Sequence, residues 1–298
     1  TSPDEFDAFA AGPGRRWVVE TDIASCFEAI PHSGLMAAIE ERIVDRRLLK
    51  LLRSLLAAGV MEDGAVRKPA SGTPQGGVIS PLLANVYLHR LDRTWQARGR
   101  GVLCRYADDL VVMCTSEREA RDALAALRAI LAELGLEPKE TKTRIVHLAE
   151  GGEGIDFLGF HHRWVRGTTP RSRHVSFLAR WPCAQAVQHA RSRIRELTAR
   201  NRLRVPVKTI VAQVNAFLRG WAGYFRYGNS ARAFDAIRHH ALRRLVLFVA
   251  KRHKRRRRFG WWVVRENSPD LLGLISLDGR VISPRPNPRV AGLAECRR

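Results

Sequence analysis

Two adjacent carboxylates, Asp108 and Asp109, stand between apolar stretches of the chain. Residues 102–103 before them and residues 110–113 after them predict a strand, a tight turn and a second strand. Neighbouring carboxylates repel each other and hold water, so the burial of two strands does not explain their presence. A divalent cation does explain it, because hard carboxylate oxygens suit Mg²⁺, which keeps positions open for phosphate oxygens. The competing interpretation is an acidic turn without a metal, since Asp is common in turns.

A third carboxylate, Asp22, lies far upstream at the end of another apolar segment. Residues 17–19 predict a buried strand, and Asp22 falls where the chain then turns toward a helix. If this strand lies beside the acidic hairpin, Asp22, Asp108 and Asp109 together are expected to hold two Mg²⁺ ions about 4 Å apart. One ion would activate an attacking 3′-hydroxyl, and the other would stabilise a leaving pyrophosphate.

Five blocks of the sequence occur in the order seen in reverse transcriptases. They are Asp22-Ile23-x-x-x-Phe27, the thirteen residues 73–85, Tyr106-Ala107-Asp108-Asp109, residues 136–145, and Phe157-Leu158-Gly159-Phe160. The alanine in the third block and the long Thr-Pro-Gln-Gly-Gly block resemble the group II intron-encoded class, the maturase reverse transcriptases. The resemblance spans about residues 15–255.

The resemblance implies an α+β fold in which a reverse-transcriptase palm precedes an all-α bundle. We expect a lead-in at 1–14, a palm with a split β-α-β pattern and an antiparallel sheet at 15–163, and a basic linker at 164–180. A helical maturase-specific (thumb/X) domain would follow at 181–258, with a tail at 259–298 that contains a hairpin at 271–281. Apolar spacing predicts three helices in the second half, at residues 183–200, 207–225 and 230–254.

The resemblance also implies roles for residues near the incoming nucleotide. The carbonyl of Ile23 would assist the metal ligands, Phe27 would stack under the sugar and clash with a 2′-hydroxyl, and Gln75 would line the nucleotide pocket. Lys142 would lie near the triphosphate. Two alternatives stay open: Phe27 as a core residue and Lys142 as a solvated lysine at a strand edge.

The end of the primer is the other substrate element for which the resemblance implies contacts. Leu158 and Gly159 would form a primer grip through the backbone at the glycine. Phe217, Trp221, Tyr224 and Phe225 form an aromatic stripe at helical spacing, which is more typical of a core than of a base-stacking platform.

Positive charge is concentrated in the second half of the chain. The net charge is +22; residues 1–160 carry 20 Lys and Arg against 23 Asp and Glu, whereas residues 161–298 carry 31 against 6. This excess implies a polyanionic partner, most simply nucleic acid. Arg191, Arg195 and the run Arg255, Arg256, Arg257 and Arg258 are the predicted RNA contacts. A solvated helix end and a nuclear address compete as interpretations of the run.

Five scattered cysteines without a Cys-x-x-Cys pair favour neither zinc nor a disulfide framework, and a cytoplasmic location fits. No apolar run is long enough for a membrane span, so no membrane partner is expected. Only about twenty residues precede Asp22, so we expect the fingers to be largely missing and the activity of the isolated chain to suffer.

The function expected from these features is RNA-directed DNA polymerisation of the group II intron type with two Mg²⁺ ions. Its partners would be an RNA template, a DNA primer, deoxynucleoside triphosphates and the intron RNA that a maturase helps to splice. The alternative is a non-catalytic RNA-binding maturase with an inactive palm. An RNA-templated RNA polymerase fits Phe27 poorly, because such an enzyme needs to accept the 2′-hydroxyl.

Overall fold

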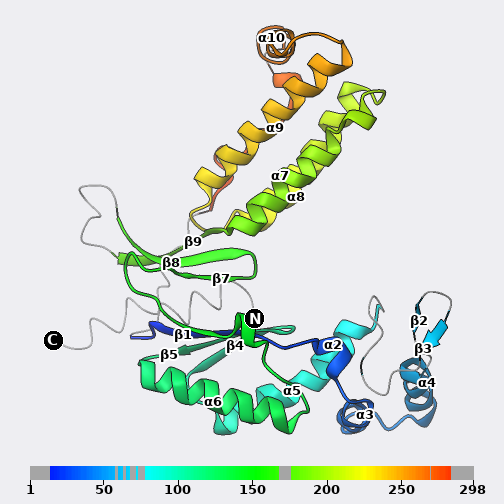
Figure 1. Cartoon of the computed structure of the whole chain (residues 1–298), viewed down its shortest axis with the longest axis vertical. Coiled ribbons are helices and arrows are strands. Elements are labelled where there is room, and N and C mark those ends of the chain that lie inside the picture. Colours follow the sequence, from blue (N-terminus) through cyan, green and yellow to red (C-terminus); the bar gives the residue numbers. More distant parts are fainter. Residues whose placement is uncertain are drawn as a thin grey trace. The chain divides into compact units, whose positions relative to one another are not determined.

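The computed structural model describes residues 14–57, 60–62, 65–67, 72, 78–167, 176–268 and 270–282 (Figure 1). The chain divides into two compact units, Thr1–Ile155 and Asp156–Arg298. In the described segments, no helix is long and apolar enough to cross a membrane.

The first unit is built on a four-stranded antiparallel sheet in the order β4-β5-β1-β6. Its strands are β1 (Trp17–Asp22), β4 (Val102–Tyr106), β5 (Asp109–Cys114) and β6 (Arg144–His147). The valines of β1 and the apolar residues of β5 are buried in the sheet, with Val19 and Val112 fully covered, whereas Trp17 is half-buried. The predicted hairpin is confirmed, because β4 and β5 are antiparallel neighbours and β1 lies beside β5. The end of the sheet that carries Asp22, Asp108 and Asp109 is called the acidic tip.

Helices α5 (Ser80–Arg98) and α6 (Glu117–Glu133) lie against one face of this sheet, and three further helices extend the same core beyond its edge (Figure 1). These three are α2 (Cys26–Ala29), α3 (His32–Glu40) and α4 (Arg46–Ala57). The Ser116 hydroxyl caps α6 by accepting from the Glu119 N–H at 3.1 Å, and the Glu119 carboxylate accepts in return from the Thr115 N–H at 2.7 Å. Leu127 and Leu131 on the inner face of α6 are fully buried. The amphipathic helix predicted after the hairpin is therefore present.

The second unit combines a small sheet with a helical bundle (Figure 1). Strands β7 (Ile155–Phe157), β8 (Phe160–Arg166) and β9 (Ser176–Pro182) form the sheet, in which β8 and β9 are antiparallel. The bundle contains α7 (Ala184–Leu197), α8 (Val207–Phe225), α9 (Ala231–Arg252) and the short α10 (Arg257–Trp261). Ile194, Leu218 and Leu245 contribute fully buried side chains to its core. The three predicted helices are confirmed.

The prediction of a simple linker in the second half is wrong. Residues 164–180 are not simply a linker, because Trp164 pairs with Leu178 and Arg166 with Ser176 in the β8–β9 ladder. These strands contain arginines among mostly apolar residues, and the interpretation as a basic linker rested on the arginines. The compact units divide after Ile155, whereas the predicted palm runs on to residue 163, and this palm boundary stays a prediction.

The tail contains no hairpin at 271–281 in the described residues; a 3₁₀ turn, Leu271–Gly273, begins this stretch. Leu274 and Leu277 then join the bundle core. The amide of Asn215 on α8 donates to the Gly273 carbonyl at 2.7 Å and accepts from the Ile275 N–H at 3.0 Å. Asn215 thus satisfies backbone groups that a partner strand would otherwise have paired.

Candidate functional site

The strand register brings together three carboxylates that are far apart in the sequence. β1 pairs with β5 so that Asp22 lies opposite Asp109. One residue further, the Ile23 N–H donates to the Asp108 carbonyl at 3.3 Å. All three acids therefore occupy the same end of the sheet, as expected if β1 lies beside the hairpin. Their roles as metal ligands stay predictions.

The three acids influence one another electrostatically. Burial raises the pKa of Asp108, and the nearby charge of Asp22 raises it as well. Burial also raises the pKa of Asp109, followed by the charges of Asp22 and Asp108. Without a cation, the repulsion between these negative charges lowers the free energy of unfolding.

Asp22 is the most deeply placed of the three and is only half satisfied. Its side chain is 12% exposed. The Oδ2 atom accepts from Lys142 Nζ at 2.5 Å, whereas the buried Oδ1 atom has no hydrogen-bond partner among the described residues. An unpaired buried carboxylate oxygen is costly, and a metal ion would satisfy it.

The carboxylate oxygens suit a hard divalent cation but supply only some of its ligands. Within the described ranges, no group of three His, Cys, Asp or Glu side chains is arranged to hold a metal ion by itself. Asp22 and Asp108 are the neighbouring carboxylates, and Mg²⁺ commonly completes its coordination with water and substrate phosphates. The chain thus supplies part of a coordination shell.

Lys142 reaches this site from a turn beside β6. It ends the 3₁₀ helix Glu140–Lys142, and the preceding Lys139 N–H donates to the Asp22 carbonyl at 2.7 Å. The hydrogen bond that Lys142 donates to Asp22 raises the pKa of Lys142. Lys142 is therefore a cation held at the acidic cluster, and not a lysine that contacts solvent alone.

Phe27 lies in α2, and Gly72 lies beside this helix. Phe27 is half-buried and packs against the first unit's core, so the core interpretation holds for part of its ring. Gly72 donates its N–H to the Ile30 carbonyl at 2.8 Å, and a Cβ at Gly72 would lie 2.8 Å from Glu28 Cα. Only glycine permits this approach, and Gly72 has a positive φ of 96°. Gln75 lies outside the described residues.

The predicted primer grip is the turn between β7 and β8 in the second unit. Leu158 and Gly159 both have positive φ, 51° and 77°. The Leu158 carbonyl accepts from Tyr224 Oη at 2.9 Å, and the Gly159 carbonyl accepts from the Cys183 N–H at 2.9 Å. The turn is thus fixed to α8 and to the start of α7.

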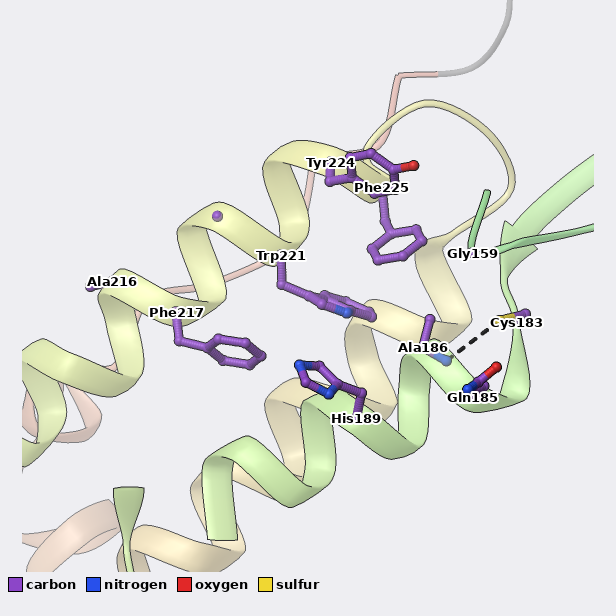
Figure 2. A pocket seen from close by; sticks show the side chains of 11 residues that line it. Gly159, Cys183, Gln185, Ala186, His189, Ala216, Phe217, Trp221, Tyr224 and Phe225 are labelled. Atoms are coloured by element: carbon purple, nitrogen blue, oxygen red, sulfur yellow. Dashed lines mark hydrogen bonds between the residues drawn. The ribbon is translucent and has the colours of Figure 1, made fainter. Parts of the chain in front are cut away.

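Gly159 also borders an aromatic groove of about 660 Å³ between α7 and α8. Figure 2 shows Phe217 and Trp221 of α8 and His189 of α7 directed into it. Trp221 and Phe225 are buried, as the core interpretation of the stripe predicts, whereas Tyr224 is 51% exposed. The stripe therefore serves both the core and the wall of a groove.

A second groove, of about 600 Å³, lies between α7 and α9, and three arginines and two histidines line it together with one carboxylate, that of Asp235. Arg191 and Arg195 line it from α7, and Arg243 lines it from α9; no ion pair neutralises these three in the described part of the chain. Burial lowers the pKa of His240 there, and the charges of Arg195 and Arg191 lower it further.

Sequence reasoning found Arg191 and Arg195 but missed the residues that face them. The sequence feature that could have revealed the facing residues is the helical spacing of His239, His240 and Arg243 on α9. The predicted run Arg255 to Arg258 lies elsewhere, at the junction of α9 and α10, and all four side chains are exposed. No described residue forms an ion pair with them.

Two family models match the chain. The model described as reverse transcriptase (RNA-dependent DNA polymerase) matches residues 4–162. The model described as group II intron, maturase-specific domain matches residues 187–266. The first covers the sheet with the acidic tip, and the second covers most of the helical bundle.

Several proteins are similar to parts of this chain. The chain is 25% identical to the "Uncharacterized 91 kDa protein in cob intron" of Schizosaccharomyces pombe, over 87% of this chain and 40% of that protein. It is 35% identical to "Protein YkfC" of Escherichia coli, over 53% of this chain and 49% of that protein. It is 49% identical to the "Group II intron-encoded protein LtrA" of Lactococcus lactis, over 27% of this chain and 13% of that protein. The chain spans less than half the length of each.

Proposed function

We propose that the first unit catalyses RNA-directed DNA synthesis, because this chain belongs to the reverse transcriptase family. The chain also carries the group II intron maturase-specific domain. The substrates would be an RNA template, a DNA primer and deoxynucleoside triphosphates. The observation that supports this best is the buried, unpartnered Asp22 Oδ1 at a tip shared with Asp108 and Asp109. A purely structural acidic turn would not need a buried oxygen without a partner.

Two bound Mg²⁺ ions would supply charge neutralisation and activation of the primer 3′-hydroxyl. Asp22, Asp108 and Asp109, with the Ile23 carbonyl, would hold them. Lys142 is placed to exchange its bond to Asp22 for a triphosphate oxygen, because its Nζ already lies at the acidic tip. Positioning and electrostatic stabilisation then provide most of the rate acceleration.

RNA-templated primer extension tests this proposal, using Asp109→Asn and, as a matched control, Asp122→Asn on the exposed face of α6. We expect Asp109→Asn to lose at least about a hundredfold in rate, a loss typical of removing one transition-state stabilising group. Asp122→Asn should extend primers like the parent. Equal rates for the parent and Asp109→Asn would refute the assignment.

We also propose that the half-buried Phe27 selects deoxynucleotides through the part of its ring that remains exposed. A bulky ring below the sugar would clash with a 2′-hydroxyl. Phe27→Ala should therefore raise ribonucleotide incorporation by roughly tenfold relative to deoxynucleotides, whereas Phe27→Tyr, which keeps the ring, should not. Unchanged sugar selectivity in Phe27→Ala would assign the residue to the core alone.

A second function, RNA binding by a maturase, is favoured by the basic groove of the second unit. Arg191, Arg195 and Arg243 present unneutralised charge to one cavity, and phosphate groups of intron RNA would neutralise it. Arg255 to Arg258 would add a second patch of phosphate contacts. This function would not depend on Asp108 or Asp109, so carboxylate variants that cannot extend primers should still bind RNA.

A further inference from the structure

The turn that carries Asp108 contains a residue in an unfavourable backbone conformation. β4 and β5 are joined by two residues, Ala107 and Asp108, and the pair Tyr106 and Asp109 closes the hairpin. Ala107 has a φ of 53°, in the left-handed region where Cβ approaches the carbonyl oxygen. Two-residue hairpins usually place Gly, Asn or Asp at such a position. An alanine therefore needs support from outside the turn to stay there.

Arg105 provides that support from within β4. Its side chain is 12% exposed, and its Nη1 donates to the Ala107 carbonyl at 3.1 Å. The next carbonyl, that of Asp108, accepts from the Ile23 N–H at 3.3 Å. Both carbonyls of the two-residue turn are thus held, one by Arg105 and the other by the residue that follows Asp22.

Arg105 is itself held rigidly by α5. Its Nε and Nη2 donate to the two carboxylate oxygens of Asp92 at 2.7 and 2.5 Å, and Nη1 also donates to Asn85 Oδ1 at 3.0 Å. A two-pronged bond between a guanidinium and a carboxylate fixes both distance and orientation. A lysine carries the same charge but cannot form this pair together with the bond to Ala107.

We propose that Arg105 is a positioning residue: it transmits the rigidity of α5 to Ala107, keeps that residue left-handed and so directs Asp108 toward Asp22. The proposal rests on the proposed function, because it gives the acidic tip a reason to be held precisely. A merely structural ion pair would stabilise the first unit and leave the conformation of the turn unchanged.

The test measures amide hydrogen exchange of residues 105–110 in the full chain, with RNA-templated primer extension in parallel. Arg105→Lys should accelerate exchange at the turn and lower kcat by roughly tenfold each, the order expected when a left-handed alanine loses its support. KM for the primer–template should change little, because the Arg105 guanidinium is already engaged with Asp92, Asn85 and Ala107.

Ala107→Gly distinguishes positioning from stability. Glycine occupies the left-handed region without the steric cost of Cβ. We therefore compare Arg105 with Arg105→Lys in a chain that already carries Ala107→Gly. In that background, the effect of Arg105→Lys on exchange and kcat should be several-fold smaller. Arg98→Lys is the matched control: Arg98, at the end of α5, likewise pairs with a carboxylate, Glu133, but at an exposed site and without a hydrogen bond to the described residues of the turn.

Asp92→Asn provides an independent second variant, because it weakens the anchor and leaves Arg105 in place. A lower melting temperature with parental exchange at the turn and parental kcat would overturn the proposal, as would an Arg105→Lys effect that Ala107→Gly does not reduce. The two proposals can fail separately. If the parent chain extends no primer, the proposed function fails, whereas the exchange measurements still decide the role of Arg105.

Discussion

Lys142 donates to Asp22, 120 residues earlier in the chain, through an Nζ to Oδ2 contact of 2.5 Å. The lysine thus places a positive charge on a carboxylate that is proposed to bind a metal. It neutralises one oxygen of Asp22 and leaves the other buried without a partner in the described residues. A protein cation and a metal ion would therefore compete for the same residue.

Replacing this lysine should expose that competition. Lys142→Gln should lower the free energy of unfolding by about 0.5–1 kcal/mol without divalent ions, since the lysine is largely exposed and screened by solvent. It should also increase the stabilisation that added Mg²⁺ gives. Thermal melting with and without Mg²⁺ measures both effects, and Lys139→Gln, in the same segment, is the control. A Mg²⁺ response identical to that of the parent would contradict the competition.

The dependence of stability on pH should report the acidic tip. Because the folded-state pKa of Asp109 is raised, its contribution favours folding at low pH and is lost as pH rises through that pKa. Asp109→Asn removes the charge, so it should be more stable than the parent at neutral pH without divalent ions. The difference should disappear in acid, where Asp109 is protonated. Melting curves from pH 3 to pH 8 would contradict this account if the variant were less stable at neutral pH.

The basic groove between α7 and α9 should contribute a defined number of phosphate contacts. Arg191→Gln and Arg243→Gln should each reduce the slope of log affinity against log salt by about one for duplex nucleic acid. Arg193→Gln is the matched control, because Arg193 lies on α7 but pairs with Glu196. Fluorescence anisotropy with a structured RNA across a salt series gives the slopes. A loss in Arg193→Gln as large as in Arg191→Gln would argue against the groove as the binding surface.

Asn215 should hold the segment that follows α10 onto the bundle. Asn215→Ala leaves the Gly273 carbonyl and the Ile275 N–H without their partner, so the free energy of unfolding should fall by about 1–3 kcal/mol. Limited proteolysis should cut residues 270–282 faster. Asn201→Ala, at an exposed position, should leave the free energy of unfolding within about 0.5 kcal/mol of the parent value. Equal protease sensitivity of the two variants would show that other contacts hold the segment.

The acidic tip could be predicted from sequence because local signals coincide there. Apolar runs of strand length end at Asp22 and on both sides of Asp108, and Ser116 with Glu119 gives the start of α6. These features depend on neighbours in the chain, and the family resemblance supplied the pairing of β1 with β5.

The missed features depend on partners far away in the sequence. The strand pairing of Arg166 with Ser176 is formed by backbone groups, which side-chain polarity does not report. Asn215 and the residues opposite Arg191 become meaningful only when helices pack together. The bond from Arg105 to Ala107 could not be predicted either, because the left-handed φ of Ala107 is not evident from an alanine in the sequence.

Direct binding of a paramagnetic metal to the acidic tip tests the central claim most simply, since it needs neither template nor primer. Mn²⁺ can replace Mg²⁺ at oxygen ligands, and its free ion is counted by electron paramagnetic resonance. The account predicts that the parent chain binds Mn²⁺ and that Asp22→Asn weakens this binding by at least about tenfold, or 1.4 kcal/mol. Parental Mn²⁺ affinity in Asp22→Asn would contradict it.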